Sequence, residues 1–257
     1  MKIGYESCGQ GNAVVLLHGF LGSSRYWQDI IPRLCPHVHV IAPDLRGHGQ
    51  SDAPDEPYSM ESMADDVAEL LALLNVRKAA MFGHSMGGYV TLAFADRHAD
   101  RLAAFGLIHS TAYADDEKGK QNRANTIGAI RNDGIAKFAD GFAPRLFAPE
   151  HVETMPERVE IARQIGRATD PVGAIRATEA MRDRPDRNET IRRADVPVLL
   201  VAGQRDQLVA VERTFSVSKP SVVQHTIPDA GHMSMLEQPE QLAEAMLAFL
   251  RRAGFLA

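Results

Sequence analysis

Short apolar runs alternate with longer amphipathic segments along most of the chain. The apolar runs are five to seven residues long and are bordered by glycine or polar residues, a pattern that predicts β-strands. Because most positions in them are β-branched or apolar, we expect these strands to be buried on both faces, as in a parallel sheet covered by helices. The predicted strands are Ala13–Leu17, Val38–Ala42, Lys78–Phe82, Leu102–Ile108, Val196–Ala202 and Val222–Ile227.

Two amphipathic segments predict helices that pack on such a sheet. Residues 59–74 carry apolar side chains at helical spacing, and Ser59 is placed to act as the N-cap. The segment Gln241–Arg251 near the end of the chain repeats the pattern. Each segment therefore has one face suited to the core.

From about Thr111 to Asp195 the alternation stops. This interval contains no convincing buried strand, and its helix-compatible stretches are separated by five prolines. We therefore expect an α/β fold with a mostly parallel central sheet flanked by helices. A core domain would comprise residues 1–110 and 196–257, and residues 111–195 would form a helical insertion.

Composition and charge narrow the class of protein. The chain has 257 residues, of which 45% are hydrophobic and 24% charged, values typical of globular proteins. The formal net charge of -5 argues against a nucleic-acid partner. No run approaches the roughly 18 apolar residues that a membrane span needs, and the N-terminus lacks the apolar core of a secretory signal. We expect a cytoplasmic protein without a membrane partner.

Cys8 and Cys35 are the two cysteines of the chain. Their spacing matches neither a metal site nor a redox motif, and a single pair in a chain of this length is not a disulfide framework. We expect two ordinary thiols that are buried or half-buried.

The strongest candidate for a catalytic residue lies in the pentapeptide GHSMG, residues 83–87. A strand ends at Phe82 and a helix-like run begins near Gly87, so the chain must reverse sharply at Ser85. Glycine at positions 83 and 87 lets the flanking backbones approach each other closely. The serine hydroxyl at the apex is then open to a base on one side and a substrate carbonyl on the other. The alternative is a glycine-rich turn that contains a serine by chance.

A second stretch, LLHGFLGSS at residues 16–24, follows an early predicted strand and forms a loop. The backbone N–H of Phe20, together with that of Met86, could stabilise a negatively charged oxygen formed at Ser85. His18 lies inside the strand-to-loop turn, which favours a structural hydrogen-bonding role over that of a catalytic base.

Two further candidates follow later strands. Asp206 comes just after the predicted strand that ends at Ala202, and His232 follows the one that ends at Ile227. Taken alone, each is equally compatible with an ordinary loop residue. The order Ser85, Asp206, His232, each just past the carboxyl end of a strand, predicts a nucleophile, an acid and a base that meet at one edge of the sheet.

With these stretches in place, the chain resembles the α/β-hydrolase fold superfamily over nearly its full length. The segment PDLRGHGQSD, residues 43–52, is similar to the one found in serine esterase, lactonase and non-haem perhydrolase members. The resemblance implies that the insertion is a helical cap over the active site. Ser85 stands where dehalogenases and epoxide hydrolases of the superfamily have aspartate and dienelactone hydrolases have cysteine, so neither class fits.

The resemblance also implies a mechanism. His232, oriented by Asp206, would accept the proton of Ser85 as its oxygen attacks an ester carbonyl, and the N–H groups of Phe20 and Met86 would stabilise the oxyanion. We expect a carboxylesterase that needs no metal or organic cofactor. It would act as a monomer or a homodimer on a small-molecule ester.

The substrate pocket should lie between the sheet edge and the insertion. We expect it to be mostly apolar and suited to esters of small to medium acyl groups. The residues expected to line it are His109, Ser110, Phe138, Phe142, Phe147 and Met181.

Several alternatives stay open. The insertion is rich in arginine, and because these residues alternate with acidic ones we expect them on its solvated surface. An arginine that pointed inward would pair with a substrate carboxylate and favour an enol-lactonase or a hydrolase of ring-cleavage products. Lactone hydrolysis, C–C bond hydrolysis and perhydrolysis could all use the same three residues. A ligand-sensing signalling protein is a more distant alternative.

Overall fold

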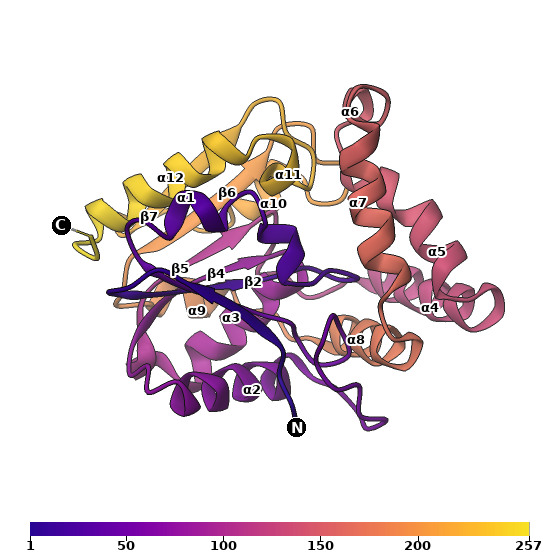
Figure 1. Cartoon of the computed structure of the whole chain (residues 1–257), viewed down its shortest axis with the longest axis horizontal. Coiled ribbons are helices and arrows are strands. Elements are labelled where there is room, and N and C mark those ends of the chain that lie inside the picture. The colour runs from indigo at the N-terminus through magenta and orange to yellow at the C-terminus, as the bar shows by residue number, and fades with distance from the viewer. Residues whose placement is uncertain (257) are drawn as a thin grey trace.

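A computed structural model describes residues 1–256, and within them seven strands form one sheet (Figure 1). The strands lie in the order β1-β3-β2-β4-β5-β6-β7, and every neighbouring pair is parallel except β1 with β3. This arrangement confirms the expected α/β class. The strands are β1 (Tyr5–Cys8), β2 (Ala13–Leu17), β3 (His39–Pro43), β4 (Ala79–His84), β5 (Leu102–Ile108), β6 (Val198–Gly203) and β7 (Val222–Ile227).

Six of these strands coincide with predicted apolar runs, and the differences lie at the edges of the sheet. Strand β1 was not predicted, because its sequence YESC is polar and mostly exposed where it pairs with β3. The expectation that every strand is buried on both faces is wrong for β7, in which only Ile227 is buried. As the other edge strand, β7 has a neighbour on one side only.

Helices cover both faces of the sheet (Figure 1). α2 (Met60–Leu73), α3 (Met86–Arg97) and α9 (Asn188–Arg193) lie on one face, and α1 (Ile31–Leu34) and α12 (Pro239–Arg252) lie on the other. Each face has its own cluster of buried apolar side chains. As predicted, Ser59 caps α2: its hydroxyl accepts a hydrogen bond from the backbone N–H of Ser62.

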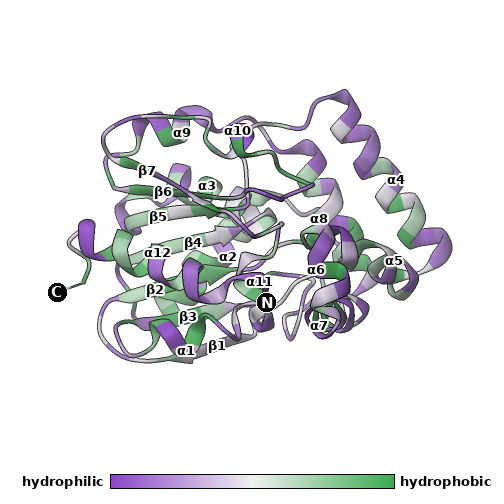
Figure 2. Cartoon of the chain, turned by 90° about the horizontal axis from the view of Figure 1, so that it is seen from above, coloured by the Kyte–Doolittle hydropathy of each residue, from purple (hydrophilic) through white to green (hydrophobic). Residues whose placement is uncertain are grey.

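The chain between β5 and β6 is helical, as the sequence predicts. Of its helices, α4 to α8 project beyond one end of the sheet, whereas α9 packs on the sheet through the buried Ile191 (Figure 2). The helices of this segment that precede α9 are α4 (Glu117–Asp133), α5 (Ile135–Phe142), η3 (Ala143–Leu146), α6 (Pro149–Thr154), α7 (Pro156–Arg167) and α8 (Pro171–Asp183). The short elements elsewhere are η1 (Ser24–Trp27), η2 (Ala99–Arg101), α10 (Val211–Thr214) and α11 (Ser234–Glu237).

Cys8 and Cys35 form a disulfide, so the expectation of two free thiols is wrong. Cys8 ends β1, Cys35 follows α1, and their Cα atoms lie 5.8 Å apart. The pairing of β1 with β3 brings the two cysteines together. Because β1 could not be predicted from its sequence, this proximity could not be predicted either.

Among the helices formed by residues 1–256, none combines the length and the apolar composition that a membrane crossing requires.

Reduction of the disulfide should destabilise the protein. The bond closes a segment with a sequence separation of 27 residues, and in the chain-entropy model such a closure contributes about 3 to 4 kcal/mol by restricting the unfolded chain. We expect dithiothreitol to lower the free energy of unfolding in urea by up to this amount. The double variant Cys8→Ser/Cys35→Ser should have the lower value with or without the reductant. An equal response to dithiothreitol in both proteins would contradict the assignment.

Candidate active site

Ser85 forms a sharp turn between β4 and α3. Its backbone angles are φ 50° and ψ -113°, and a positive φ of this kind costs a non-glycine residue about 1 to 3 kcal/mol. Ser85 is partly exposed, whereas its neighbours His84 and Met86 are buried. The turn therefore presents the serine hydroxyl at the carboxyl end of the sheet.

Three glycines make this turn possible. A Cβ atom at Gly83 would overlap the carbonyl of Gly87, and one at Gly87 would overlap the carbonyl of Leu17 in β2. A Cβ atom at Gly88 would overlap the hydroxyl of Ser110. The contacts are with backbone and buried atoms that cannot move aside, so the turn requires glycine at these positions.

Ser110 supports the turn and does not line the pocket, contrary to expectation. Its hydroxyl is buried and donates a 2.7 Å hydrogen bond to the carbonyl oxygen of Ser85. The N–H of Ser85 in turn donates to the carbonyl of Ile108 at 2.9 Å. Both bonds tie the turn to the end of β5.

His232 and Asp206 meet beside this turn. Nδ1 of His232 lies 2.7 Å from Oδ2 of Asp206, and Oδ1 of Asp206 accepts hydrogen bonds from the N–H groups of Leu208 and Val209 at 2.8 and 3.0 Å. Burial opposes ionisation of Asp206, but the charge of His232 and the hydrogen bonds outweigh it and lower the pKa of the carboxyl group. The carboxylate therefore fixes the His232 ring with a proton on Nδ1.

His109 was expected to line the pocket, and the structure places it behind Asp206 instead. The ring is completely buried; its Nε2 lies 2.6 Å from the hydroxyl of Ser234, and its Nδ1 lies 3.4 Å from Oδ2 of Asp206 and 3.1 Å from the N–H of Gly203. His109 has a positive φ of 48°, and its ring is not among the side chains that line the cavity.

His84 is a component that the sequence reasoning missed. Its Nε2 lies 2.9 Å from the carbonyl oxygen of His232, and the two ring centroids are 4.9 Å apart. Burial, followed by the neighbouring His232 and His109, lowers the pKa of His84 well below its ordinary value. The ring therefore stays neutral and donates to His232 through Nε2.

His18 has the structural role expected from its position. Its Nδ1 donates to the carbonyl of Gly19 at 2.7 Å, and its Nε2 accepts from the N–H of Leu45 at 2.9 Å. These bonds hold the loop after β2 against the segment after β3. Burial lowers the pKa of His18, which keeps it neutral.

The backbone N–H groups of Phe20 and Met86 are the two donors that were expected to stabilise an oxyanion at Ser85. Within residues 1–256, neither group donates a hydrogen bond. Gly19 packs directly on Ser85, with a Cβ built at Gly19 falling 3.2 Å from Cβ of Ser85. A tight turn closed by the 3.0 Å bond from the N–H of Gly22 to the carbonyl of Gly19 fixes this loop. The arrangement leaves two free donors beside the serine.

Glu237, also missed from the sequence, holds the loop that carries His232. Its buried carboxylate accepts hydrogen bonds from the N–H groups of Gly231 and Met233, both at 3.0 Å, on either side of His232. It also accepts from the N–H of Ala148 at 2.8 Å and lies 2.8 Å from Nδ1 of His151, both in the helical insertion. A glutamate five residues after a histidine carries no local signal of this role.

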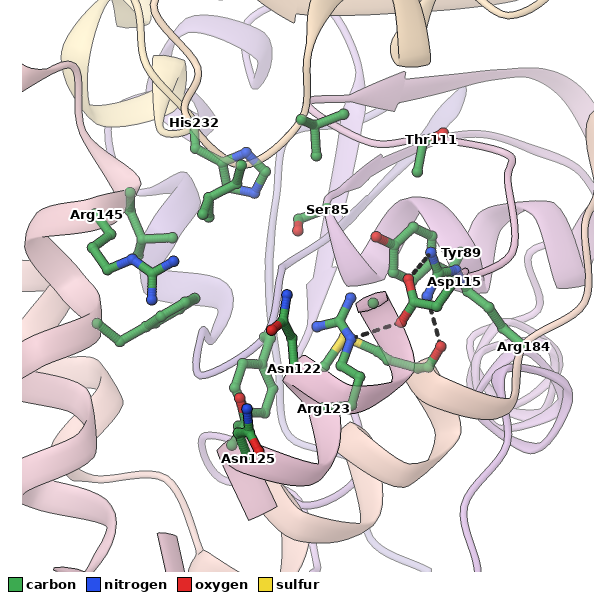
Figure 3. Close-up of a pocket in the computed structure, with 18 of the residues that line it drawn as sticks. Ser85, Tyr89, Thr111, Asp115, Asn122, Arg123, Asn125, Arg145, Arg184 and His232 are labelled. Atoms are coloured by element: carbon green, nitrogen blue, oxygen red, sulfur yellow. Dashed lines mark hydrogen bonds and ion pairs between the residues drawn. The ribbon is translucent and has the colours of Figure 1, made fainter. Parts of the chain in front are cut away.

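A cavity of about 640 Å³ opens in front of Ser85 and His232 (Figure 3). Of the residues expected to line it, Phe138, Phe142 and Met181 do so, and Phe20 lies beside them. Phe147 does not, because it is completely buried in the core against the other face of the sheet.

Much of the cavity lining is polar, which was not predicted from the sequence. It includes Asn122, Asn125 and Thr126 from α4 together with several ionisable side chains. The cationic ones are Lys118, Arg123, Arg145, Arg184 and Arg213, and the acidic ones are Asp115 and Asp116. The expectation that arginines of the insertion lie on its solvated surface is wrong for Arg184 and Arg187, which are buried; Arg123 and the exposed Arg145 both line the cavity.

Asp115 neutralises part of this charge. Its carboxylate lies 2.9 Å from Nε of Arg123 and 2.7 Å from Nη2 of Arg184. Arg184 is buried and stacks on the ring of Tyr89 at 3.9 Å. Burial opposes ionisation of Asp115, but the two arginines outweigh it and lower its pKa.

His109, Asp206 and His232 also offer atoms within 4.8 Å of one another, a grouping that could hold a metal ion. The 2.7 Å separation between Asp206 and His232 is instead that of a direct hydrogen bond. The arrangement suits proton transfer by His232, with no ion needed to explain the position of either side chain.

Comparisons with known proteins identify the family to which the chain belongs. A family model described as the alpha/beta hydrolase family matches residues 14–245, so the chain belongs to that family. Among solved structures, a thermophilic esterase from Thermogutta terrifontis superposes with a TM-score of 0.93 and 35% identity, over 98% of this chain and 93% of the esterase. The enol-lactonase from Burkholderia xenovorans LB400 superposes with a TM-score of 0.90 and 26% identity, over 97% of this chain and 96% of the lactonase.

A curated relative is similar over a part of its own length. The dihydrolipoyllysine-residue acetyltransferase component of the acetoin cleaving system of Pseudomonas putida is 31% identical over 96% of this chain, which spans 66% of that relative. Proteins of different named activities thus share this fold.

Replacing Glu237 should loosen the loop around His232. In Glu237→Gln an amide NH₂ must face backbone N–H groups that the carboxylate now accepts, and we expect a loss of about 3 kcal/mol in the free energy of unfolding in urea. Glu240→Gln is the matched control, because Glu240 is exposed and pairs only with Arg33. Equal stability of the two variants would show that the carboxylate does not hold the loop.

His48 should make stability depend on pH. It is buried, and burial lowers its pKa to about 3, whereas the unfolded value is about 6.5. As the pH falls below that value, the unfolded chain binds a proton that the folded protein does not, so stability is lost. We expect His48 to account for about 2 kcal/mol of the loss between pH 7 and pH 5. His48→Gln should show a smaller decrease in urea unfolding than the wild type, whereas replacing the exposed His37 with Gln should not.

Proposed function

We propose that the protein is a serine hydrolase that cleaves carboxylic esters through an acyl-enzyme, with Ser85 as nucleophile, His232 as base and Asp206 as the orienting acid. The observation that carries this proposal is the 2.7 Å bond between Nδ1 of His232 and Asp206. It directs the free Nε2 of His232 to the cavity that also exposes Ser85 (Figure 3). Hydrogen bonds between a base and its nucleophile commonly tighten when substrate binds.

The proposed reaction has two halves. Nε2 of His232 takes the proton of Ser85 as the serine oxygen attacks the ester carbonyl, and the N–H groups of Phe20 and Met86 stabilise the oxyanion. His232 then protonates the departing alcohol. A water molecule, deprotonated by His232, hydrolyses the acyl-enzyme in the second half. The reaction uses no metal or organic cofactor.

The cavity supports small to medium acyl groups as substrates. Its volume of about 640 Å³ is in the range of small-molecule sites, and Phe20, Phe138 and Phe142 form an aromatic cluster along one wall. We further propose that α4 to α8 serve as a cap over this cavity, because α4, α5 and α8 contribute to its walls.

Lactone hydrolysis is a second candidate. A lactone is an internal ester, so Ser85 and His232 would act on it in the same way. The similarity of the whole chain to an enol-lactonase favours it. In this case the alcohol stays attached to the acyl group until water releases the hydroxy acid.

Loss of the three side chains tests the assignment. Purified protein is assayed with p-nitrophenyl esters from acetate to octanoate and with a set of lactones. We expect Ser85→Ala and His232→Ala each to lose at least about a thousandfold in kcat. Asp206→Asn should also lose orders of magnitude, because an amide can hold the imidazole in the wrong tautomer.

Ser221→Ala and His37→Ala are matched controls that remove the same side chains outside the cavity lining. They should keep wild-type rates. Retained activity in Ser85→Ala or in His232→Ala would refute the mechanism, and the ratio of lactone to ester turnover separates the two candidate substrates.

A further inference from the structure

Arg145 is a cation of the cavity lining for which residues 1–256 provide no ion-pair partner. It lines the same cavity as Ser85 and His232, and among residues 1–256 no carboxylate forms an ion pair with it and no group shares a hydrogen bond with its guanidinium. Arg123 and Arg184, in contrast, share Asp115. Arg145 is therefore free to pair with an anion brought by a ligand.

The backbone at Arg145 is tied to the loop that carries His232. Arg145 belongs to η3, and the next residue, Leu146, accepts a 2.8 Å hydrogen bond from the backbone N–H of His232. Figure 3 shows Arg145 on the same side of Ser85 as His232, with Arg184 on the other side. A group bound at Arg145 would thus lie in the same cavity as the serine.

The other residues of the cavity lining indicate what kind of molecule fits between Arg145 and Ser85. Phe142 and Leu146, on either side of Arg145 in the sequence, both line the cavity. Their side chains add apolar surface to the cavity lining. The cationic side chains of the cavity are Lys118, Arg123, Arg145, Arg184 and Arg213, against the acidic Asp115 and Asp116. This excess of positive charge attracts anions and disfavours cationic substrates.

Arg145 is better placed than Lys118 and Arg213, the other two cations of the cavity lining that lack an ion pair among residues 1–256. Lys118 lies in the first turn of α4 and, like Arg145, is exposed. Arg213 is stacked on the ring of Tyr113 with its guanidinium 4.9 Å from the ring centroid. Arg145 alone of the three is joined through its own segment to the His232 loop.

We propose that the substrate is an ester or lactone that carries a carboxylate, bound by the guanidinium of Arg145 while the reacting carbonyl lies at Ser85. A guanidinium can donate two parallel hydrogen bonds to a carboxylate, which fixes orientation as well as charge. This inference rests on the proposed hydrolase function and names its substrate class. The carboxylate can belong to the acyl group or to the alcohol.

Pairs of substrates distinguish a carboxylate on the acyl group from one on the alcohol. For the acyl group, the mono(4-nitrophenyl) ester of adipic acid is compared with 4-nitrophenyl hexanoate, which has the same chain length without the carboxylate. For the alcohol, 4-acetoxybenzoate is compared with its methyl ester. We expect wild-type kcat/KM to favour the anionic member of at least one pair by about tenfold or more, through a lower KM.

Arg145→Gln tests the residue itself. We expect it to lower kcat/KM for the favoured anionic ester at least about tenfold relative to its neutral partner, mainly by raising KM. Arg145→Lys should restore part of the preference, because it keeps the charge but not the paired hydrogen bonds. Arg163→Gln is the matched control, because Arg163 lies outside the cavity lining and pairs with Glu160 on α7. This control should keep the wild-type preference.

Two results would overturn the inference. One is a wild type without preference for either anionic ester; the other is an equal effect of Arg145→Gln on both members of each pair. If no ester or lactone is hydrolysed, the proposed function fails instead, and binding of adipate measured by calorimetry decides about Arg145. Affinity for adipate should fall at least about tenfold in Arg145→Gln, and unchanged affinity would remove Arg145 as a carboxylate site.

Discussion

The close approach of three backbone segments around Ser85 is the constraint on which the site depends. The end of β2, the turn from β4 into α3 and the end of β5 meet without room for side chains at Gly83, Gly87 or Gly88. This contact forces the positive φ of Ser85. The same contact sets where the N–H groups of the β2 loop and of α3 point, so one packing arrangement positions Ser85, the proposed nucleophile, and the two N–H donors proposed to stabilise the oxyanion.

Two buried carboxylates complete the site, and they act on different parts of the same loop. Asp206 bonds to the imidazole of His232, whereas Glu237 bonds to the backbone on both sides of it. A buried charge is costly unless it is fully hydrogen-bonded, and each carboxylate is satisfied by backbone N–H donors as well as by a histidine. Because Glu237 also bonds to Ala148 and His151, the position of His232 is linked to that of the insertion.

The sequence predicted those parts that leave a local pattern. Six strands show as apolar runs, and the turn at Ser85 shows as a serine between glycines, because backbone crowding admits few residue types. Strand β1 and the disulfide at Cys8 could not be predicted, since an edge strand needs no apolar run and its partner is distant in sequence. His109 was expected in the pocket because it ends a strand, but the direction of a side chain at a strand end depends on its φ angle.

The polarity of the cavity could not be predicted from the sequence of the insertion, because it depends on which charged residues pair in the fold. Its arginines alternate with acidic residues, and pairing by proximity in sequence suggests a neutral, solvated surface. Several of those acids form ion pairs away from the cavity, such as Asp140 with Arg167 and Glu160 with Arg163. The charges of the insertion therefore alternate along the sequence but are unevenly distributed in the fold. Among residues 1–256, no carboxylate pairs with Arg145.

The proposed catalytic residues and the charged residues of the cavity lining lie in different parts of the fold. Ser85, Asp206 and His232, the proposed nucleophile, acid and base, follow the ends of β4, β6 and β7, where hydrogen bonds hold them in place. Except for Arg213, the charged side chains that line the cavity belong to the insertion, which is joined to the His232 loop through Leu146 and Glu237. If the proposed function holds, substitutions in the insertion can change which ester is chosen without moving Ser85, while the link through Glu237 limits how far the insertion can shift before His232 moves with it.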